Sequence, residues 1–224
     1  MPFFDAFEAA IFDLDGTLID SMPLWENFCG NWLKSLNKIP GPTLEADIVS
    51  MTINESVEYV KRHYELDLSP EELIVQWENA MTPIYLKKAP LKKGVKELMQ
   101  ALAFKGIKLG IATYSFPRCT KEILIHHGIY SYFSMILHGH EFGQITGIAS
   151  VKKVPGFWCA AAERLNTAPE KCIVFEDSSS SLQGARAAGM GFAAVYDSSW
   201  GDWTEFSKAA DLALNYPGEA LLII

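Results

Sequence analysis

The sequence predicts an α/β fold, in which a parallel β-sheet has helices on both faces and an all-helical insertion follows its first strand. From residue 91 onward, short apolar runs alternate with amphipathic segments of helical period. This alternation is typical of βαβ units. A similar apolar run at 9–12 also predicts a strand, but the next segment with a strand pattern begins only at residue 107. Residues 20–90 carry helical periodicity and no clear strand, so we expect them to form the insertion.

The first strand and the insertion are predicted from their apolar spacing. Residues 9–12, Ala-Ala-Ile-Phe, form a buried strand that ends at a glycine turn. Ser69 and Pro70, followed by two glutamates, are typical of a helix start. Apolar residues three and four positions apart predict three further helices, over 21–38, 44–49 and 55–64.

The remaining segments predict the rest of the sheet and its helices. Strands are expected over 107–113, 132–137, 172–175 and 192–195. Helices are expected over 94–104, 118–127, 155–165 and 182–188. The predicted division is a core domain of residues 1–19 and 91–224, with an α-helical domain of residues 20–90 inserted into it.

Composition and charge exclude several classes of protein. The chain has 224 residues, 49% of them hydrophobic and 21% charged, which is ordinary for a globular protein with a buried core. Its net charge of −8 disfavours broad contact with nucleic acid or an anionic membrane. No apolar run suits a membrane helix, and the acidic N-terminal segment is unlike a secretory signal. The cysteines are widely spaced, which favours free, buried thiols and a cytoplasmic location: Cys29, Cys119, Cys159 and Cys172.

Paired carboxylates follow the first predicted strand. Asp13 and Asp15 lie two positions apart, so both can face the crevice at the carboxyl end of a parallel strand. Their mutual repulsion separates their pKa values unless a cation is present. With Mg²⁺, Asp13 would stay ionised as a nucleophile and Asp15 could stay protonated as an acid. A plain Asp-Gly turn or a helix cap is the alternative.

Three other segments place polar groups at strand ends or helix entries. Glu176 and Asp177 follow the strand at 172–175 and offer the oxygen ligands that Mg²⁺ prefers. Thr113 ends another strand and could bind a phosphoryl oxygen. Lys152 precedes a helix and could neutralise phosphate charge. Capping residues and a solvated basic pair are the alternatives. Together the groups suit phosphoryl transfer, in which cations and positioning stabilise the transition state.

These four segments, in this order, resemble the motifs of the haloacid dehalogenase-like (HAD) hydrolase superfamily. The strongest stretches are Asp-Leu-Asp-Gly-Thr-Leu at 13–18 and PEKCIVFEDSSSSLQGARAAGM at 169–190. They are similar to the branch that contains phosphatases and β-phosphoglucomutase. The resemblance covers the core and implies a Rossmann-like sheet with an inserted helical cap. The helical insertion matches such a cap only in position and helical character.

The resemblance implies a role for each candidate residue. Asp13 would attack phosphorus, and Asp15 would protonate the leaving oxygen and then activate water. Mg²⁺ would be bound by the Asp13 and Asp177 carboxylates and the Asp15 backbone carbonyl, with Glu176 as a further ligand or a neighbour of one. Thr113 and the Tyr114 amide would hold phosphoryl oxygens, and Lys152 would bridge Asp13 and phosphate.

The chain departs from the family pattern at several positions. The family usually has Lys-Pro-x-Pro-Asp, whereas this chain has Lys-Lys-Val-Pro-Gly at 152–156, so Lys153 is an alternative to Lys152. Ser181 stands where Gly is common and Gly184 where Ala is common. We expect both to be packing positions without effect on the chemistry.

Within the insertion, Thr52 and Asn54 lie where related caps present a substrate-facing loop. Trp25 is expected to pack inside the helical domain. Four cationic or titratable residues are expected on solvated helix faces: Arg62, His63, Lys87 and Lys88. His138 and His140 are expected on a surface loop.

The resulting hypothesis is a Mg²⁺-dependent phosphatase of a small phosphorylated metabolite that acts through an aspartyl-phosphate. A β-phosphoglucomutase-like sugar phosphomutase is the first alternative, and a non-catalytic module that binds phosphate or Mg²⁺ is a remote one. The expected protein is a monomer or homodimer, and neither nucleic acid nor membrane is an expected partner.

Overall fold

The computed structural model describes residues 3–49, 51–147 and 150–224. Six strands form one sheet in the order β3-β2-β1-β4-β5-β6, with every pairing parallel. Their bounds are β1 Ala9–Phe12, β2 Lys108–Thr113, β3 Phe133–His138, β4 Cys172–Glu176, β5 Gly191–Val195 and β6 Leu212–Leu214. The predicted α/β fold with a parallel sheet is therefore confirmed.

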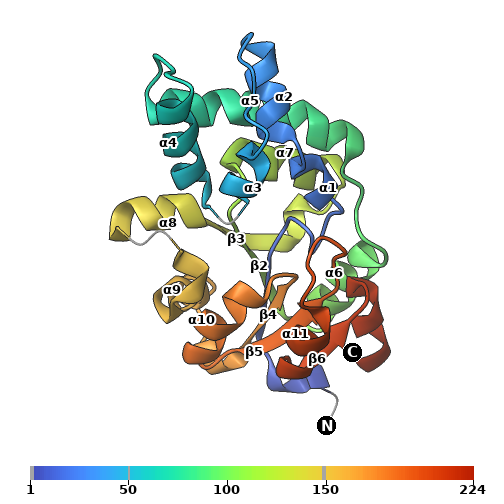
Figure 1. Ribbon diagram of the computed structural model, residues 1–224. Helices are drawn as coiled ribbons and strands as arrows, with labels where there is room; N and C mark the ends of the chain where they lie inside the picture. Colours follow the sequence, from blue (N-terminus) through green and yellow to red (C-terminus); the bar gives the residue numbers. More distant parts are fainter. Residues whose placement is uncertain (1–2, 50, 148–149) are drawn as a thin grey trace.

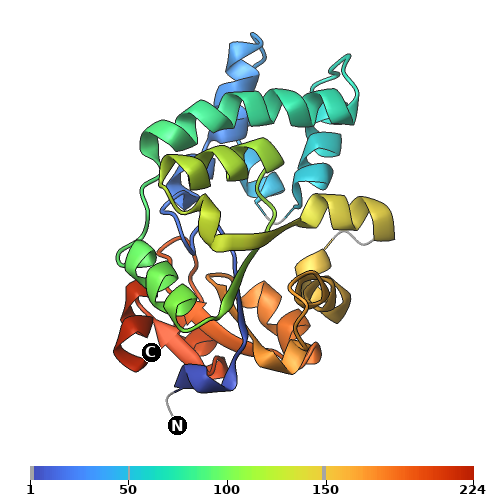
Figure 2. The same cartoon turned by 180° about the vertical axis from the view of Figure 1, so that it is seen from behind.

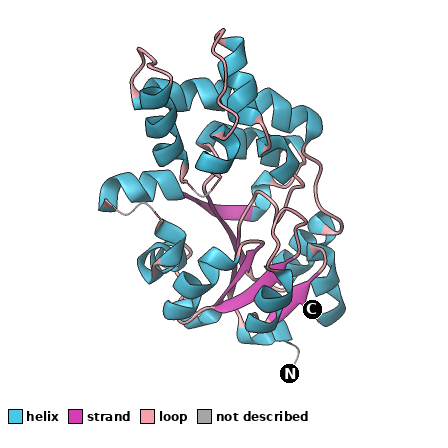
Figure 3. Ribbon diagram, in the orientation of Figure 1, coloured by secondary structure: helices cyan, strands magenta, loops and turns pink. Residues whose placement is uncertain are grey.

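Helices cover both faces of the sheet (Figure 3). Alternate residues of β1 point to opposite faces, as the two-residue period of a strand requires. Ala10 and Phe12 face a core that includes α6 (Val95–Phe104) and α7 (Pro117–His126). Ala9 and Ile11 face a second core, built on α9 (Pro155–Arg164), α10 (Leu182–Ala187) and α11 (Trp203–Ala209). Because both faces are buried, the strands read as continuous apolar runs.

The insertion after β1 forms a layer of helices beyond the carboxyl ends of the strands (Figure 1). Its helices are α1 Met22–Trp25, α2 Phe28–Ser35, α3 Leu44–Ile48, α4 Ile53–His63 and α5 Pro70–Lys88. Seen from behind, α5 runs across the top of the molecule above α7 (Figure 2). No helix in the described ranges combines the length and apolar character that crossing a membrane would require.

The prediction of one continuous helix over 21–38 is wrong. The segment 21–38 is broken into α1 and α2 at Asn27, whose φ of 57° is left-handed. Asparagine tolerates this conformation better than most residues, so the apolar period continues although the helix does not. The predicted start of α5 is correct, since Ser69 and Glu72 form a complete capping box there.

The two connections between the insertion and the sheet lie side by side. Ile19 and Leu91 form an antiparallel bridge. The Asp20 amide donates to the Pro90 carbonyl at 2.9 Å, and the Lys92 amide donates to the Leu18 carbonyl at 2.9 Å. The chain therefore leaves and re-enters the sheet region through one paired crossing.

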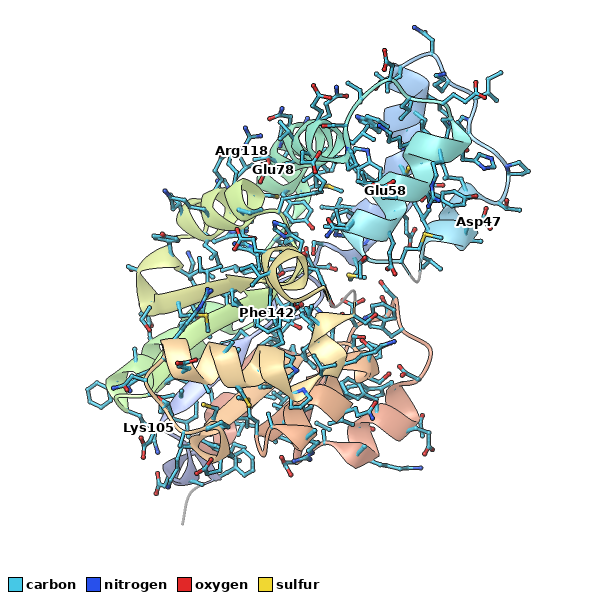
Figure 4. The ribbon with its side chains drawn as sticks, turned by 90° about the vertical axis from the view of Figure 1, so that its left-hand side faces the viewer. Asp47, Glu58, Glu78, Lys105, Arg118 and Phe142 are labelled. Carbon is cyan, nitrogen blue, oxygen red and sulfur yellow. The ribbon has the colours of Figure 1, made fainter. Side chains whose placement is uncertain are left out.

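A second contact holds the insertion to the core farther along α5. The Arg118 amide, at the start of α7, donates to Glu78 Oε1 at 2.7 Å, and the Arg118 guanidinium donates to Asn79 Oδ1 at 2.7 Å. Figure 4 shows Arg118 beside Glu78, away from Asp47 and Glu58 at the far end of the insertion.

One strand and two α-helices are absent from the predictions. These are β6, α8 (Gly139–Thr146) and α11. β6 has only three residues at the sheet edge, too few for a clear period.

Three cysteines are buried as expected, but Cys159 is exposed on α9.

Loss of the α5 cap should destabilise the fold measurably. Ser69→Ala removes the hydroxyl that accepts from the Glu72 amide and should lower the free energy of unfolding by about 1 kcal/mol. The expected fall in Tm is roughly 2–4 °C, measured by thermal denaturation followed by circular dichroism. The matched control is Ser131→Ala, because Ser131 is exposed. An unchanged Tm in Ser69→Ala would contradict the capping argument.

Candidate active site

The candidate groups meet at the carboxyl edge of the sheet because β1 lies between β2 and β4. Phe12 pairs with Ile111 on one side and with Phe175 on the other, so the residues that follow the three strands are neighbours. Thr113 ends β2, Glu176 ends β4, and the Asp13 amide donates to the Phe175 carbonyl at 2.9 Å. The predicted convergence of these segments is confirmed.

The turn after β1 is closed tightly around Asp177. Gly16 has a φ of +76°, and a Cβ at this position would lie 2.2 Å from Asp177 Oδ2. Thr17 Oγ1 donates to Asp177 Oδ1 at 3.2 Å, and Trp200 Nε1 donates to Oδ2 at 2.6 Å. Only glycine satisfies both the backbone angle and the close approach. Trp200, from the loop after β5, was not predicted to take part in the site.

Asp15 is held by donors from both ends of the insertion. Ser21 Oγ donates to Asp15 Oδ1 at 2.6 Å, and the hydroxyl of Tyr85 on α5 donates to the same oxygen. Burial raises the pKa of Asp15, whereas the Ser21 and Tyr85 bonds stabilise its carboxylate and oppose that rise. Tyr85 was not predicted, because its contact with Asp15 spans 70 positions and leaves no local pattern.

Lys152, and not Lys153, reaches the carboxylates. Lys152 Nζ donates to Asp13 Oδ1 at 2.5 Å and to Glu176 Oε1 at 2.8 Å, and all three side chains are buried. Burial by itself would lower the pKa of Lys152, yet the two carboxylates raise it above its usual value. Lys153 is exposed. The ammonium of Lys152 therefore stays charged within the site.

The backbone of Lys152 is fixed by two core residues. Trp158 Nε1 donates to the Lys152 carbonyl at 2.8 Å. A Cβ at position 184 would lie 2.2 Å from that carbonyl oxygen and 2.8 Å from the Lys153 carbonyl carbon. Gly184 is therefore a packing position, as predicted, but it packs against the backbone of the site lysine.

Three carboxylates form a cluster with metal-binding spacing. Asp13, Glu176 and Asp177 are buried, and one oxygen of each lies within 4.8 Å of the others. Burial, with help from Glu176 and Asp15, raises the pKa of Asp13 to about 7 despite the opposing Lys152. Burial and the Glu176 charge raise the pKa of Asp177 well above its usual value. One ammonium does not balance these charges, so the cluster suits a divalent cation with oxygen preference.

Thr113 retains a donor for a ligand. The Ser115 amide donates to Thr113 Oγ1 at 3.0 Å, which uses the hydroxyl as an acceptor. The hydroxyl proton is still available, since a threonine both donates and accepts. Tyr114 packs beneath the lysine, with its ring centroid 5.5 Å from Lys152 Nζ, and its hydroxyl accepts from the Lys152 amide at 3.3 Å.

A cavity of about 780 Å³ joins these residues to the insertion. Thr52, the N-cap of α4, lines this cavity, whereas Asn54 is not among the lining residues. Trp25 both packs against its neighbours and lines the cavity. Arg62, His63, Lys87 and Lys88 are exposed and do not line it, in agreement with the predicted solvated faces.

The prediction for His138 is wrong. His138 is buried at the end of β3, and its Nδ1 lies 3.0 Å from the Ser115 carbonyl oxygen. His140 is half-buried beside it on α8. Because β3 runs one residue farther than predicted and leads directly into α8, the two rings lie inside the fold and not on a loop.

Comparison with known proteins agrees with this geometry. Residues 10–195 match the family described as haloacid dehalogenase-like hydrolase. The "Phosphorylated carbohydrates phosphatase" of Thermotoga maritima is 28% identical over 97% of this chain and 98% of its own length. The "Probable pseudouridine-5'-phosphatase" of Drosophila melanogaster is 26% identical over 84% of this chain and 80% of its own length. The structure of CbbY from Rhodobacter sphaeroides superimposes with a TM-score of 0.78 at 20% identity, over 95% of this chain and 96% of that one. With the family match covering most of the chain, the protein belongs to the haloacid dehalogenase-like hydrolases.

Proposed function

We propose that the protein is a Mg²⁺-dependent phosphatase that hydrolyses a small phosphate monoester through an aspartyl-phosphate on Asp13. The observation that carries this proposal is the buried Lys152 ammonium between Asp13 and Glu176, beside Asp177. The named activities of the two relatives support phosphate release. Because their named substrates differ, they do not identify the alcohol that carries the phosphate in this protein's substrate.

The chain's own residues supply each step of the reaction. A carboxylate oxygen of Asp13 forms a bond to phosphorus while the ester P–O bond breaks, and Asp15 gives its proton to the departing alcohol oxygen. Asp15 then takes a proton from water, whose oxygen attacks phosphorus and releases Asp13 and inorganic phosphate. Lys152 and the Thr113 hydroxyl stabilise the charge on the phosphoryl oxygens.

The residues present fit a magnesium ion. The Asp13 and Asp177 carboxylates and the Asp15 backbone carbonyl would hold it, with Glu176 as a further ligand or a neighbour of one. The ion would offset the excess negative charge of the cluster and the substrate. Without it, the raised pKa of Asp13 would leave a large part of this nucleophile protonated at neutral pH.

Residues 20–90 would act as a cap domain over the core of residues 1–19 and 91–224. The cavity between α1–α4 and the strand ends supports this role, because both parts supply its lining. Closure would exclude water other than the attacking molecule. A cytoplasmic location, a monomeric or homodimeric state and the absence of nucleic-acid partners stay predictions.

Asp13→Asn should abolish phosphate release. Amide nitrogen and oxygen are poor nucleophiles, so we expect kcat to fall by at least roughly 10³-fold. The measurement is Mg²⁺-dependent phosphate release from a panel of phosphorylated metabolites, with removal of the metal by EDTA as a parallel test. Full turnover in the variant would contradict the assignment of the nucleophile. Interconversion of hexose phosphates without phosphate release would instead indicate a mutase, and ligand binding without turnover a binding module.

Replacing Lys152 should reduce activity far more than replacing Lys153. Lys152→Met keeps the aliphatic stem but removes the charge beside Asp13, so kcat should fall roughly 10²–10³-fold. Lys153→Met is the paired variant and should stay within about threefold, since Lys153 lines the cavity with an exposed side chain and forms no ion pair with the described site carboxylates. Steady-state phosphate release measures both. A larger loss in Lys153→Met would reverse the assignment.

Gly184→Ala should reduce activity by displacing the lysine. The added methyl would overlap the Lys152 carbonyl, and a shift of about 1 Å in a catalytic group can cost up to roughly 10²-fold. We expect a fall in kcat of roughly 10-fold to 100-fold in the same assay. Gln183→Ala, an exposed change in the same helix, is the control. Equal kcat values for the two variants would contradict this prediction, because they would mean that the Lys152 segment moves aside for the methyl group without loss of activity.

A further inference from the structure

We propose that the substrate carries a single phosphoryl group on an uncharged alcohol with an apolar or aromatic ring, and that the insertion selects against a second anionic group. This inference rests on the proposed function and adds the chemical class of the leaving group. It depends on the side of the cavity formed by the insertion, which lies opposite the strand ends.

The insertion contributes a mostly apolar lining. We call the following side chains the apolar wall: Met22, Trp25, Phe28, Cys29, Ile48, Val49, Met51, Ile53 and Trp77. Removing such a surface from water is favourable only when the leaving group covers it with apolar area of its own. Against these side chains a polyhydroxylated sugar would lose hydrogen bonds to water. The polar side chains that the described part of the insertion adds to the lining are fewer: Glu26, Asn27, Glu45, Thr52 and Ser56.

The aromatic part of the wall is held rigidly. The Trp25 ring packs against Phe28 with centroids 5.7 Å apart, against Tyr85 at 6.2 Å and against Phe116 at 6.0 Å. Phe28 packs in turn edge-on against Trp77 at 5.9 Å. Trp25 is only half-buried, so part of its surface is free to contact a ligand. Since the rings are already fixed, binding a ring costs little ordering of the wall.

The charges on the insertion side are negative. Among the described residues that line the cavity, the only lysines or arginines are Lys152 and Lys153, and both come from the core segment Val151–Lys153. The insertion supplies Glu26 and Glu45. A carboxylate or second phosphate on the leaving group would face these acids without a cation from the insertion, which disfavours its binding.

Trp77 adds one uncharged donor to the wall. Its Nε1 is buried and has no hydrogen-bond partner among the described residues, while its indole lines the cavity. A buried N–H without a partner is costly, so an uncharged acceptor that reached this atom would be bound favourably.

The test compares four alcohol phosphates as substrates. We expect kcat/KM for benzyl phosphate to exceed that for glucose 6-phosphate, phosphoglycolate and glucose 1,6-bisphosphate by at least tenfold. Higher values for any of the other three would overturn the inference while leaving the phosphatase proposal intact. Failure to release phosphate from any substrate would instead contradict the proposed function.

A binding measurement keeps the two proposals separate. Calorimetry on the wild-type protein with Mg²⁺ compares benzylphosphonate with phosphonoacetate, neither of which can be hydrolysed as an ester. We expect benzylphosphonate to bind at least tenfold more tightly. Equal or weaker binding would overturn the inference whatever the turnover results.

Variants of the wall provide the structural control. Trp25→Leu should raise KM for benzyl phosphate about tenfold and leave inhibition by inorganic phosphate unchanged, since phosphate binds at the strand ends. Trp203→Leu alters a tryptophan of α11 outside the cavity and should leave KM unchanged. Ile48→Arg places a cation on the wall and should raise kcat/KM for phosphoglycolate at least tenfold. An unchanged KM in Trp25→Leu or no gain in Ile48→Arg would overturn the inference.

Discussion

The site depends on one buried ammonium. Lys152 lies between Asp13 and Glu176 with all three side chains removed from solvent. A buried charge is tolerated only with a partner, and removing one member of such a group costs about 3–5 kcal/mol. The lysine therefore makes the burial of the carboxylates possible, while those carboxylates keep it charged. Its own backbone is in turn fixed by Trp158 and by the absence of a side chain at Gly184.

The sheet order explains why these groups meet. β1 is central and short, and it ends one residue before Asp13. Its two parallel neighbours bring Thr113 and Glu176 to the same edge from segments more than fifty positions apart. Parallel pairing aligns the strand ends, so a small number of terminal residues builds the whole charged cluster. The same topology places the paired crossing of the insertion next to that cluster.

Much of the core could be predicted from sequence because its signals are local. The strand at 9–12, the helix start at Ser69 and the acids after β4 each follow from adjacent residues. The contacts of Tyr85 with Asp15 and of Trp200 with Asp177 could not, since each depends on two distant segments packing together. The helix break at Asn27 was missed for the opposite reason, because the local pattern was misleading. The apolar period continues through this residue, but its left-handed backbone interrupts the helix. His138 was misplaced for a similar reason, as β3 continues into α8 without an intervening loop.

The insertion contributes to the site in two places. Ser21 and Tyr85 lie near its two ends, close to the paired crossing, and both donate to Asp15. The residues that line the cavity from the insertion come mainly from α1–α4 and lie beyond that crossing. Trp25 connects the two regions, because this wall residue packs against Tyr85, whose hydroxyl donates to Asp15. On the proposed function, the acid is therefore held at the crossing and the alcohol lies against the wall, with Trp25 packed between the two.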